Sequence, residues 1–405
     1  MKNPLCVVFA TVCIMVSMTA CKPKGQPPAS GRPAAQVSVE LTGAPLRIGV
    51  LFSTTGTFSI SESPMLYAAK MAIDEINAST GINGSPIEPI YSDYGSDPAV
   101  AANKARQLIV QDKVMAIVGT NSTSTRLAVK PVIEEHNSLL IYNTYYEGET
   151  PSRNIIYTNT VPNQQIDHFI PWIIRMQRTS RPRIYMVGSD YEYPHKGIAY
   201  AKKLAAQHGG TVVGEEYAPV GHTDFSSIIG NIKRVRPDVV FSIIAGNSLV
   251  PFYRQYHEAG ITAAEIPIYA CATHEGTAMN IGAEAAAGHY SSFSYFNTLG
   301  TPESDAFVQK YTALFGTDTV VTNQAASVYH GVYLLKAALE KAASYATEDI
   351  IAAFSGLEID APAGRVKMDE TNHHAWLPSY IGRINKNCTF DIVYRSDGTI
   401  APVLE

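Results

Sequence analysis

The chain has few cysteines and no excess of positive charge. Its 405 residues include 5 cysteines, and 31 lysines and arginines stand against 36 aspartates and glutamates, which gives a net charge of -5. A protein whose main partner is nucleic acid carries a basic face, so this balance argues against that class. Apolar residues make up 46% of the chain and charged residues 17%. This composition and this length favour a globular protein of about two domains.

The usual signatures of enzymes and metal sites are also missing. The sequence contains no G-x-S-x-G elbow, no H-E-x-x-H motif and no phosphate-binding G-x-x-x-x-G-K-[ST] loop. The stretch "NHH" at 372–374 is a weak metal candidate, and Cys271 and Cys388 do not have metal-ligand spacing. We therefore expect no metal, no cofactor and no catalytic activity. The sequence leaves open whether the two cysteines pair, and we favour two unpaired, partly buried thiols.

The N-terminus predicts export and a lipid anchor. Residues 1–20 contain Lys2 and then a short apolar run, which is typical of a secretory signal peptide rather than of a membrane span. "MTAC" (18–21) resembles a bacterial lipobox, with Cys21 as the lipidated first residue of the mature protein. The rest of residues 21–44 is rich in Pro, Gly, Ser, Ala and Gln, a composition that favours a flexible tether. These features predict an extracytoplasmic or periplasmic body held at a membrane.

Beyond residue 45, short apolar runs alternate with segments of helical periodicity. "LRIGVLF" (46–52) begins a first series of strands and helices, and "RIYMV" (183–187) begins a second. Two long helices are expected over 303–342, and a closing hairpin is expected over 380–396. This order predicts an α/β protein with two Rossmann-like lobes, each built on a doubly wound parallel sheet.

Five stretches together resemble the type I periplasmic binding proteins, and within them the group that binds urea and short-chain amides. They are "SISE" (59–62), "YYEGE" (145–149), "VPNQQ" (161–165), "VGSDYEYP" (187–194) and "DAPAGRVKMDETNHH" (360–374). The resemblance covers about residues 45–400 and implies a clamshell with a three-segment hinge. Its crossings would lie near 162–165, 293–297 and 364–368.

The same resemblance implies how the chain is divided between the lobes. Lobe 1 would comprise residues 45–163 and 296–365, and lobe 2 would comprise 164–295 and 366–405. The ligand would lie between the lobes at the carboxyl ends of both sheets, where open α/β sheets generally bind ligands.

On lobe 1, the candidate site residues follow strands. "VGTNSTSTR" (118–126) opens a helix, whose free N–H groups and hydroxyls suit a ligand oxygen. Thr123 matches the hydroxyl that meets the ligand in the family, although simple helix capping is the alternative. Tyr142 and Thr144 match a ring and a hydroxyl that line the family's pocket. Ser61 and Glu62 either contact the ligand or cap the helix that follows them.

On lobe 2, two tyrosines and two polar residues are candidates. Tyr191 and Tyr193 would close over the ligand, because a tyrosine covers a small solute with its ring and keeps a hydroxyl for hydrogen bonding. The alternative is that one of the two packs on the hinge. Glu275 matches a position that meets an amino or amide N–H in related proteins, and Asn247 could both donate and accept. His274 is expected to be structural.

These features predict a lipid-anchored solute-binding protein of an ABC importer that binds urea or a short-chain aliphatic amide by lobe closure. Its partners would be the solute, the permease subunits and the membrane. Two alternatives stay open. Thr123, Thr144 and Glu275 could together hold a branched-chain or other aliphatic amino acid, and the protein could be a surface sensor instead of a transport component.

Overall fold

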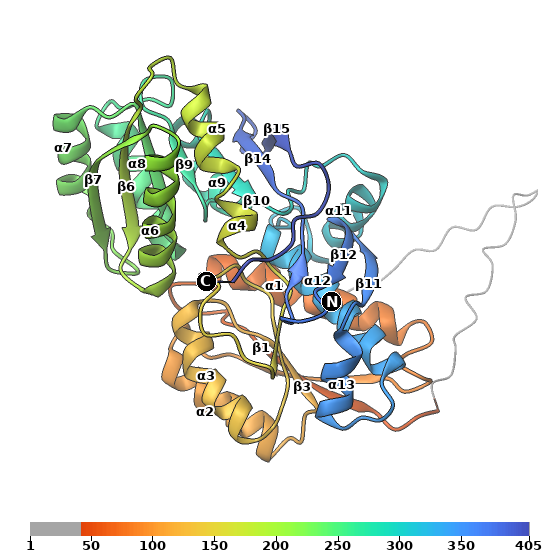
Figure 1. Cartoon of the computed structure of the whole chain (residues 1–405). Coiled ribbons are helices and arrows are strands. Elements are labelled where there is room, and N and C mark those ends of the chain that lie inside the picture. Colours follow the sequence, from red (N-terminus) through yellow and green to blue (C-terminus); the bar gives the residue numbers. More distant parts are fainter. Residues whose placement is uncertain (1–41, 405) are drawn as a thin grey trace, which may run out of the picture. The chain divides into compact units, whose positions relative to one another are not determined.

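Two parallel β-sheets, each with its own apolar core, organise the chain. The computed structural model describes residues 42–404 (Figure 1). The α/β class is confirmed, as is the prediction of one mainly parallel sheet in each half. The predictions for residues 1–41, which include the signal peptide and the lipidation of Cys21, lie outside the described residues.

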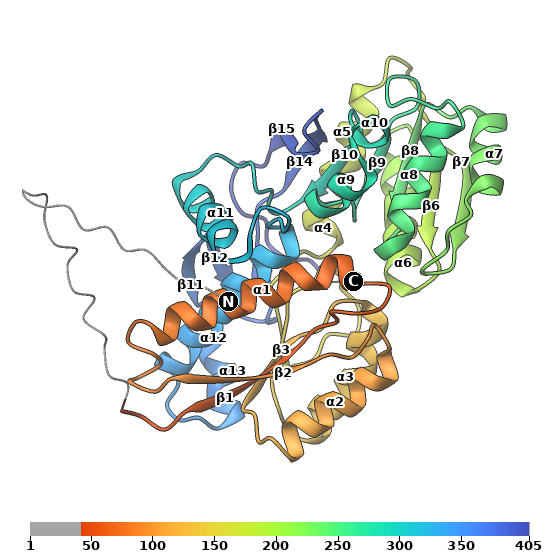
Figure 2. The ribbon, with the colours of Figure 1, turned by 180° about the vertical axis from the view of Figure 1, so that it is seen from behind.

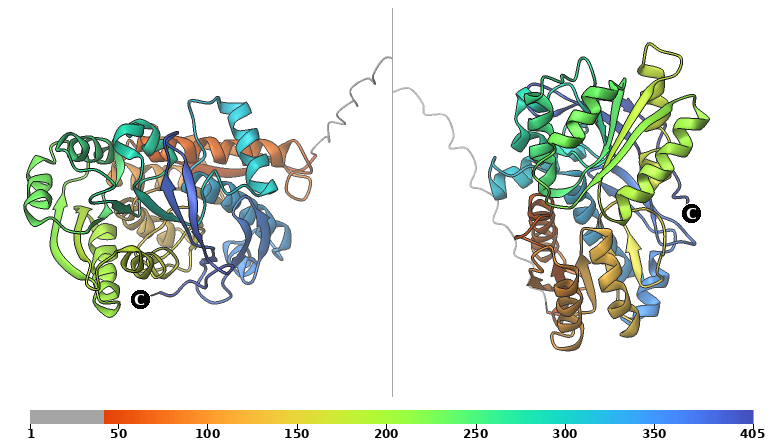
Figure 3. Two further views of the ribbon diagram at one scale, coloured as in Figure 1. Left: turned by 90° about the horizontal axis from the view of Figure 1, so that it is seen from above. Right: turned by 90° about the vertical axis from the view of Figure 1, so that its left-hand side faces the viewer.

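Lobe 1 is built on a five-stranded parallel sheet in the order β2-β1-β3-β4-β5. Its strands are β1 (Leu46–Leu51), β2 (Ile87–Ser92), β3 (Ala116–Gly119), β4 (Leu140–Tyr142) and β5 (Ile155–Tyr157). Helices cover both faces of the sheet (Figure 1, Figure 3). One face packs against α1 (Ser59–Asn77), α11 (Pro302–Phe315), α12 (Asn323–Lys341) and α13 (Thr347–Phe354), and the other against α2 (Pro98–Val110) and α3 (Thr123–Glu135). Burial on both faces explains why these strands read as continuous apolar runs.

Lobe 2 is built on a seven-stranded sheet in the order β15-β14-β10-β9-β8-β6-β7. Its strands are β6 (Arg183–Ser189), β7 (Thr211–Ala218), β8 (Val239–Ile243), β9 (Ile268–Ala270), β10 (Tyr290–Phe293), β14 (Tyr380–Ile384) and β15 (Phe390–Arg395). The first five are parallel, and the predicted closing hairpin adds β14 antiparallel to β10 and then β15 antiparallel to β14. Its helices are α5 (Phe169–Met176), α6 (Glu192–Gln207), α7 (Ser226–Val235), α8 (Leu249–Glu258), α9 (Glu275–Ile281) and α10 (Ala283–Ala286) (Figure 2).

The chain passes between the lobes at two of the three expected places. The short helix α4 (Pro162–Gln165) carries the first crossing, and the segment between β10 and α11 carries the second. The prediction that the third crossing lies at 364–368 is wrong. A separate three-stranded sheet spans this region with β11 (Glu358–Ala361), β12 (Gly364–Met368) and β13 (Ala375–Trp376). Val366 and Met368 alternate along β12 and bury one face of it in the core of lobe 1, so the chain leaves lobe 1 only after Leu377.

The C-terminal residues also return to lobe 1, so the expected assignment of 366–405 to lobe 2 holds for β14 and β15 but not for the last residues of the chain. The Asn163 side chain donates to the carbonyl of Ala401 at 2.8 Å and accepts from the N–H of Val403 at 2.9 Å. Leu404 packs against the core on the α2 and α3 side of lobe 1. Residues 401–403 therefore lie beside α4.

Two further expectations concern the cysteines and the membrane. Cys271 and Cys388 are both free and buried, so the prediction that they are unpaired is confirmed. Within residues 42–404, no helix has both the length and the apolar character that crossing a bilayer requires.

Gln165 fastens the first crossing to lobe 2. Its side-chain amide donates to the carbonyls of Cys271 at 3.0 Å and Ser292 at 2.7 Å, and its side-chain oxygen accepts from the Tyr193 hydroxyl at 2.7 Å. All of these groups are buried, and so none of them can turn to water instead.

We therefore predict that Gln165→Ala strongly destabilises the protein. Each buried group left unpaired costs about 1–3 kcal/mol, so we expect the free energy of unfolding in guanidinium chloride to fall by about 3 kcal/mol. Gln207→Ala, an exposed position at the end of α6, serves as the control and should change it by less than about 0.5 kcal/mol. A similarly small loss for Gln165→Ala would show that the hinge does not depend on this side chain.

Candidate functional site

A small cavity lies where the carboxyl ends of strands from both lobes meet. Lobe 1 lines it with Phe58, Ser61, Asn121, Ser122, Thr123, Thr144, Tyr145 and Gln324. Lobe 2 lines it with Tyr191, Tyr193, Ala245, Gly246 and Ala272. The centre of a water-sized sphere can occupy about 20 Å³ of it, which is room for a solute of only a few non-hydrogen atoms. None of these lining residues carries a charged side chain.

Five residues proposed from the sequence come together in this cavity. They are Ser61, Thr123, Thr144, Tyr191 and Tyr193. Their position at strand ends explains the meeting, because parallel strands bring their carboxyl ends to one edge of each sheet. Contact of these residues with a ligand stays a prediction.

The hydroxyls of lobe 1 are already oriented by hydrogen bonds. Ser122 caps helix α3 by accepting from the N–H of Thr125 at 3.2 Å, and Thr123 is the first residue of the helix. The Thr123 hydroxyl donates to a Glu147 oxygen at 2.6 Å. The Thr144 hydroxyl donates to the Asn121 side-chain oxygen at 3.0 Å, which leaves the amide N–H groups of Asn121 for another acceptor. The first N–H groups of α3 have no partner within the helix.

The two tyrosines of lobe 2 have different roles. The Tyr193 hydroxyl donates to Gln165, and its ring lies 5.2 Å from that of Tyr145. Tyr193 therefore packs on the hinge while one part of it lines the cavity. Tyr191 sets its ring edge-on against Phe58 at 6.3 Å, and its hydroxyl has no hydrogen-bond partner in the part of the chain that the structure describes. Burial holds the pKa of Tyr191 well above its ordinary value, so this hydroxyl remains a donor.

Tyr142 and Glu62 do not reach the cavity, against the prediction. Tyr142 is buried on the α2 and α3 side of the lobe 1 sheet, where its hydroxyl donates to the Asn121 carbonyl at 2.5 Å. Glu62 turns toward the sheet and accepts from the N–H of Ser53 at 2.6 Å and the hydroxyl of Tyr94 at 2.8 Å. Burial raises the pKa of Glu62 to about 8, against the effect of these hydrogen bonds. Both residues therefore hydrogen-bond the segments that follow the strands of lobe 1, on the side away from the cavity.

Asn247 and Glu275 also lie away from the cavity. The Asn247 side chain is exposed, and its backbone N–H donates to the carbonyl of Thr57 on lobe 1 at 3.0 Å. Glu275 faces the second crossing, where one carboxyl oxygen accepts from the N–H of Asn297 at 2.8 Å. Its other oxygen is buried without a partner among the described residues. The family match suggested a ligand-facing carboxylate here, but the start of α9 directs it to the hinge.

Sequence reasoning missed several lining residues, of which Gln324 is the most informative. Gln324 lies in the first turn of α12, is 1% exposed, and points its amide nitrogen at the Tyr145 hydroxyl at 3.4 Å. Its side-chain oxygen has no partner among residues 42–404. Tyr145 stood inside a stretch that carried the family resemblance, and Asn121 stood inside the candidate stretch 118–126. Gln324 gave no such signal, because it is 179 residues from Tyr145 in the chain.

Polar contacts join the two lobes around the cavity. The Ser61 hydroxyl and the His274 ring nitrogen lie 3.2 Å apart, and burial lowers the pKa of His274 to about 4, so the ring is neutral. Gly246 has φ +63°, and a Cβ there would lie 2.7 Å from the Thr57 carbonyl. A glycine is therefore needed where this part of the lobe 2 backbone lies against Thr57 of lobe 1.

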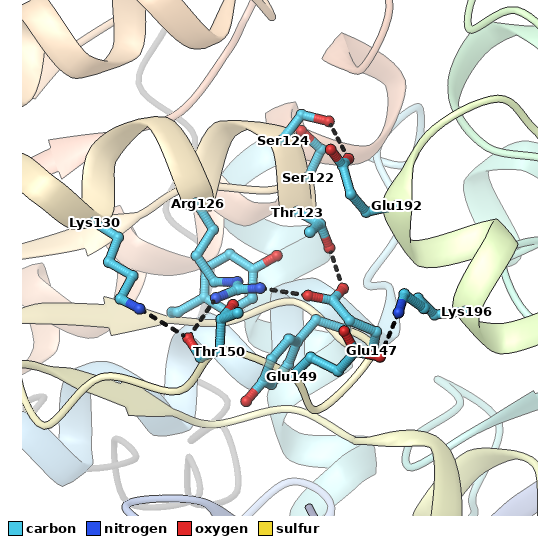
Figure 4. Close-up of polar contacts among 12 residues, drawn as sticks. Ser122, Thr123, Ser124, Arg126, Lys130, Glu147, Glu149, Thr150, Glu192 and Lys196 are labelled. Atoms are coloured by element: carbon cyan, nitrogen blue, oxygen red, sulfur yellow. Dashed lines mark hydrogen bonds and ion pairs between the residues drawn. The ribbon is translucent and has the colours of Figure 1, made fainter. Parts of the chain in front are cut away.

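Two more contacts come from helix α6, as Figure 4 shows. The Ser124 hydroxyl donates to Glu192 at 2.9 Å, and Lys196 pairs with Glu149 at 2.8 Å. The Lys196 and Glu149 side chains are 52% and 32% exposed, so this pair contributes little energy. The lobes are closed over the cavity.

The weak metal candidate at 372–374 is used in packing. His374 stacks on Tyr157 with ring centres 4.1 Å apart and meets the Tyr146 hydroxyl at 2.5 Å. Burial lowers the pKa of His374 to about 4. Within the described residues, no group of three or more His, Cys, Asp or Glu side chains is arranged to hold a metal ion.

A family model and a curated relative both match most of the chain. A family model described as a periplasmic binding protein domain matches residues 46–404. The chain is 25% identical over 366 residues to "Leu/Ile/Val-binding protein homolog 6" of Brucella melitensis, a match that covers 84% of this chain and 88% of that protein.

Two solved structures share the fold. One is a solute-binding protein of an ABC transporter from Rhodopseudomonas palustris in complex with 3,4-dihydroxybenzoic acid, with a TM-score of 0.81 and 23% identity over 88% of this chain and 98% of that one. The other is a branched-chain amino acid transporter substrate-binding protein from Streptococcus pneumoniae in complex with isoleucine, with a TM-score of 0.75 and 22% identity over 88% and 100%.

The buried carboxyl of Glu275 predicts a pH-dependent stability. Burial raises its pKa from 4.5 to about 7, so the folded chain keeps a proton that the unfolded chain loses in this range. The contribution of Glu275 to the free energy of unfolding therefore falls as the pH rises through this window. Glu275→Gln cannot lose a proton, and we expect its stability relative to wild type to rise by about 3 kcal/mol between pH 4.5 and pH 8.

Unfolding in guanidinium chloride at several pH values measures this difference. Glu303→Gln, at an exposed position of α11, is the control. A difference between Glu275→Gln and wild type that does not change with pH would contradict the raised pKa.

Proposed function

The chain belongs to the periplasmic binding protein family, and on that premise we propose that it is a solute-binding protein of an ABC importer whose ligand is urea or a short-chain aliphatic amide. The observation that carries the proposal is the cavity between the lobes, which is small and has no charged lining side chain. A neutral solute of a few atoms fits both properties. The proposal includes extracytoplasmic placement and a lipid anchor at Cys21, which rest on the signal-peptide pattern of residues 1–20, the "MTAC" stretch and the composition of residues 21–44.

The polar groups of the cavity match the two ends of an amide. The unpartnered Gln324 oxygen can accept from a ligand NH2 group. The Tyr191 hydroxyl, the Asn121 amide and the first N–H groups of α3 can donate to a ligand carbonyl. A buried polar group without a partner costs about 1–3 kcal/mol, so a solute that pairs these groups is favoured over one that leaves them unpaired.

The second candidate is an amino acid, which the name of the Brucella relative favours. A zwitterion needs an acceptor for its ammonium group, and Glu275, the residue expected to supply it, accepts from Asn297 instead. A leucine or isoleucine side chain also needs more space than the cavity offers in this closed arrangement. We therefore rank the neutral amide first.

Lobe closure is the proposed step that links binding to delivery. Ligand contacts from both lobes would favour the closed arrangement over an open one, because only the closed form brings Tyr191 and Thr123 to the same solute. The contacts of His274, Glu192 and Lys196 with lobe 1 would further stabilise the closed arrangement. The closed form would dock on the permease. A surface sensor would use the same closure with a different partner.

Ligand-dependent melting tests the proposed solute class. A ligand that binds only the folded state raises the melting temperature by mass action. We expect urea, formamide, acetamide or propionamide at millimolar concentration to raise it. Leucine, isoleucine and 3,4-dihydroxybenzoate should leave it unchanged, and a rise with these three alone would replace the proposal with the amino acid or aromatic acid alternative.

Substitution of Tyr191 tests the site itself. We predict that Tyr191→Ala weakens binding of the preferred solute by about 1–3 kcal/mol, or one to two decades in dissociation constant. Tyr191→Phe should weaken binding by about 1 kcal/mol, because it removes a hydroxyl that has no protein partner and can hydrogen-bond the ligand. Tyr91→Ala, at an exposed tyrosine of β2, is the matched control for titration calorimetry. Wild-type affinity in Tyr191→Ala with a lower melting temperature would mean that the ring is structural.

A further inference from the structure

We propose that Glu147 is a positioning residue that determines the ligand specificity of the site through Thr123. By holding the proton of the Thr123 hydroxyl, Glu147 leaves only lone pairs of that oxygen facing the cavity, and the site then selects an N–H group over an anionic oxygen. This inference rests on the proposed function, since it concerns the same cavity and the same class of ligand.

The first observation is the hydrogen bond between the two side chains. The Thr123 hydroxyl donates to one Glu147 oxygen at 2.6 Å (Figure 4). Thr123 lines the cavity and is 2% exposed. A hydroxyl has one proton to donate, so a threonine that donates to a carboxylate can only accept from a ligand.

The second observation is that Glu147 cannot turn away. Its other oxygen accepts from the Arg126 guanidinium, and the two side chains are 0% and 3% exposed. The guanidinium lies over the Tyr146 ring at 4.4 Å and also donates to the Thr150 carbonyl. Arg126 and Thr123 are three residues apart and share one face of α3, so the carboxylate binds both at once (Figure 4). The buried pair therefore fixes the direction of the Thr123 hydroxyl.

The third observation is a second acceptor in the same cavity. The Gln324 oxygen is buried without a partner in residues 42–404. A ligand NH2 group has two protons to donate and can satisfy lone pairs of Thr123 and Gln324. A carboxylate of the same shape would place negative oxygen against these lone pairs, with no Lys or Arg among the lining residues to compensate. The arrangement thus separates acetamide from acetate, which differ only in this group.

The test compares the dissociation constants of acetamide and acetate by titration calorimetry. We expect wild type to bind acetamide more tightly. In Glu147→Gln, the glutamine amide can donate an N–H to Thr123, which frees the Thr123 proton for the ligand. The ratio of the acetate to the acetamide dissociation constant should therefore fall about tenfold or more, which is the change that one ordinary hydrogen bond supplies. Glu135→Gln, at the end of α3, breaks an exposed pair with Arg106 of α2 and should leave the ratio unchanged.

Two further variants distinguish positioning from a structural effect. Thr123→Val keeps the Glu147 and Arg126 pair and removes the acceptor, so it should lower the ratio even where Glu147→Gln does not fold. In the Thr123→Val background, adding Glu147→Gln should change the ratio no further, whereas Thr123→Ser alone should retain the wild-type ratio. An unchanged ratio in Thr123→Val, or in a folded Glu147→Gln, overturns this inference and leaves the proposed function standing. Wild-type protein that binds neither urea nor any amide overturns both.

Discussion

A polar side chain that is buried away from water must find a partner, and this constraint shapes the region between the lobes. Gln165 uses both ends of its amide to join the first crossing to β9, β10 and α6. Arg126 and Glu147 neutralise each other beneath Thr123. Once these groups are paired, the Gln324 oxygen stays buried without a partner, and the Tyr191 hydroxyl has none in the described structure. A ligand that supplies the missing hydrogen-bond partners removes the free-energy cost of leaving these groups unpaired, and this favours its binding.

Much of the fold could be predicted from the sequence because its signals are local. Continuous apolar runs such as 46–52 fit strands buried on both faces, and helical periodicity located the elements between them. The third crossing could not be predicted in this way. Val366 and Met368 alternate as in any half-buried strand, and nothing in that pattern says which lobe covers them.

The site was predictable to the extent that it depends on strand ends. Ser61, Thr123, Thr144, Tyr191 and Tyr193 lie in the loops or first helical turns that come after strands, and they line the cavity. Tyr142 and Glu275 were placed there by family match, but local packing turns Tyr142 toward α2 and α3 and Glu275 toward the hinge. Gln324 joins from a distant part of the chain through the packing of α12 on α1, which no local pattern indicates. Sequence reasoning finds the edge of the site, and tertiary packing decides which side chains enter it.

A crystal structure of the protein grown with its preferred small amide, at a concentration near the dissociation constant, tests the central claim most directly. The account predicts density for one neutral solute between the lobes, with its NH2 group within hydrogen-bond distance of the Thr123 hydroxyl oxygen and the Gln324 oxygen and with its carbonyl toward Tyr191 or Asn121. Solute density outside this cavity, or an amide in the cavity whose NH2 group points away from these two oxygens, would contradict it.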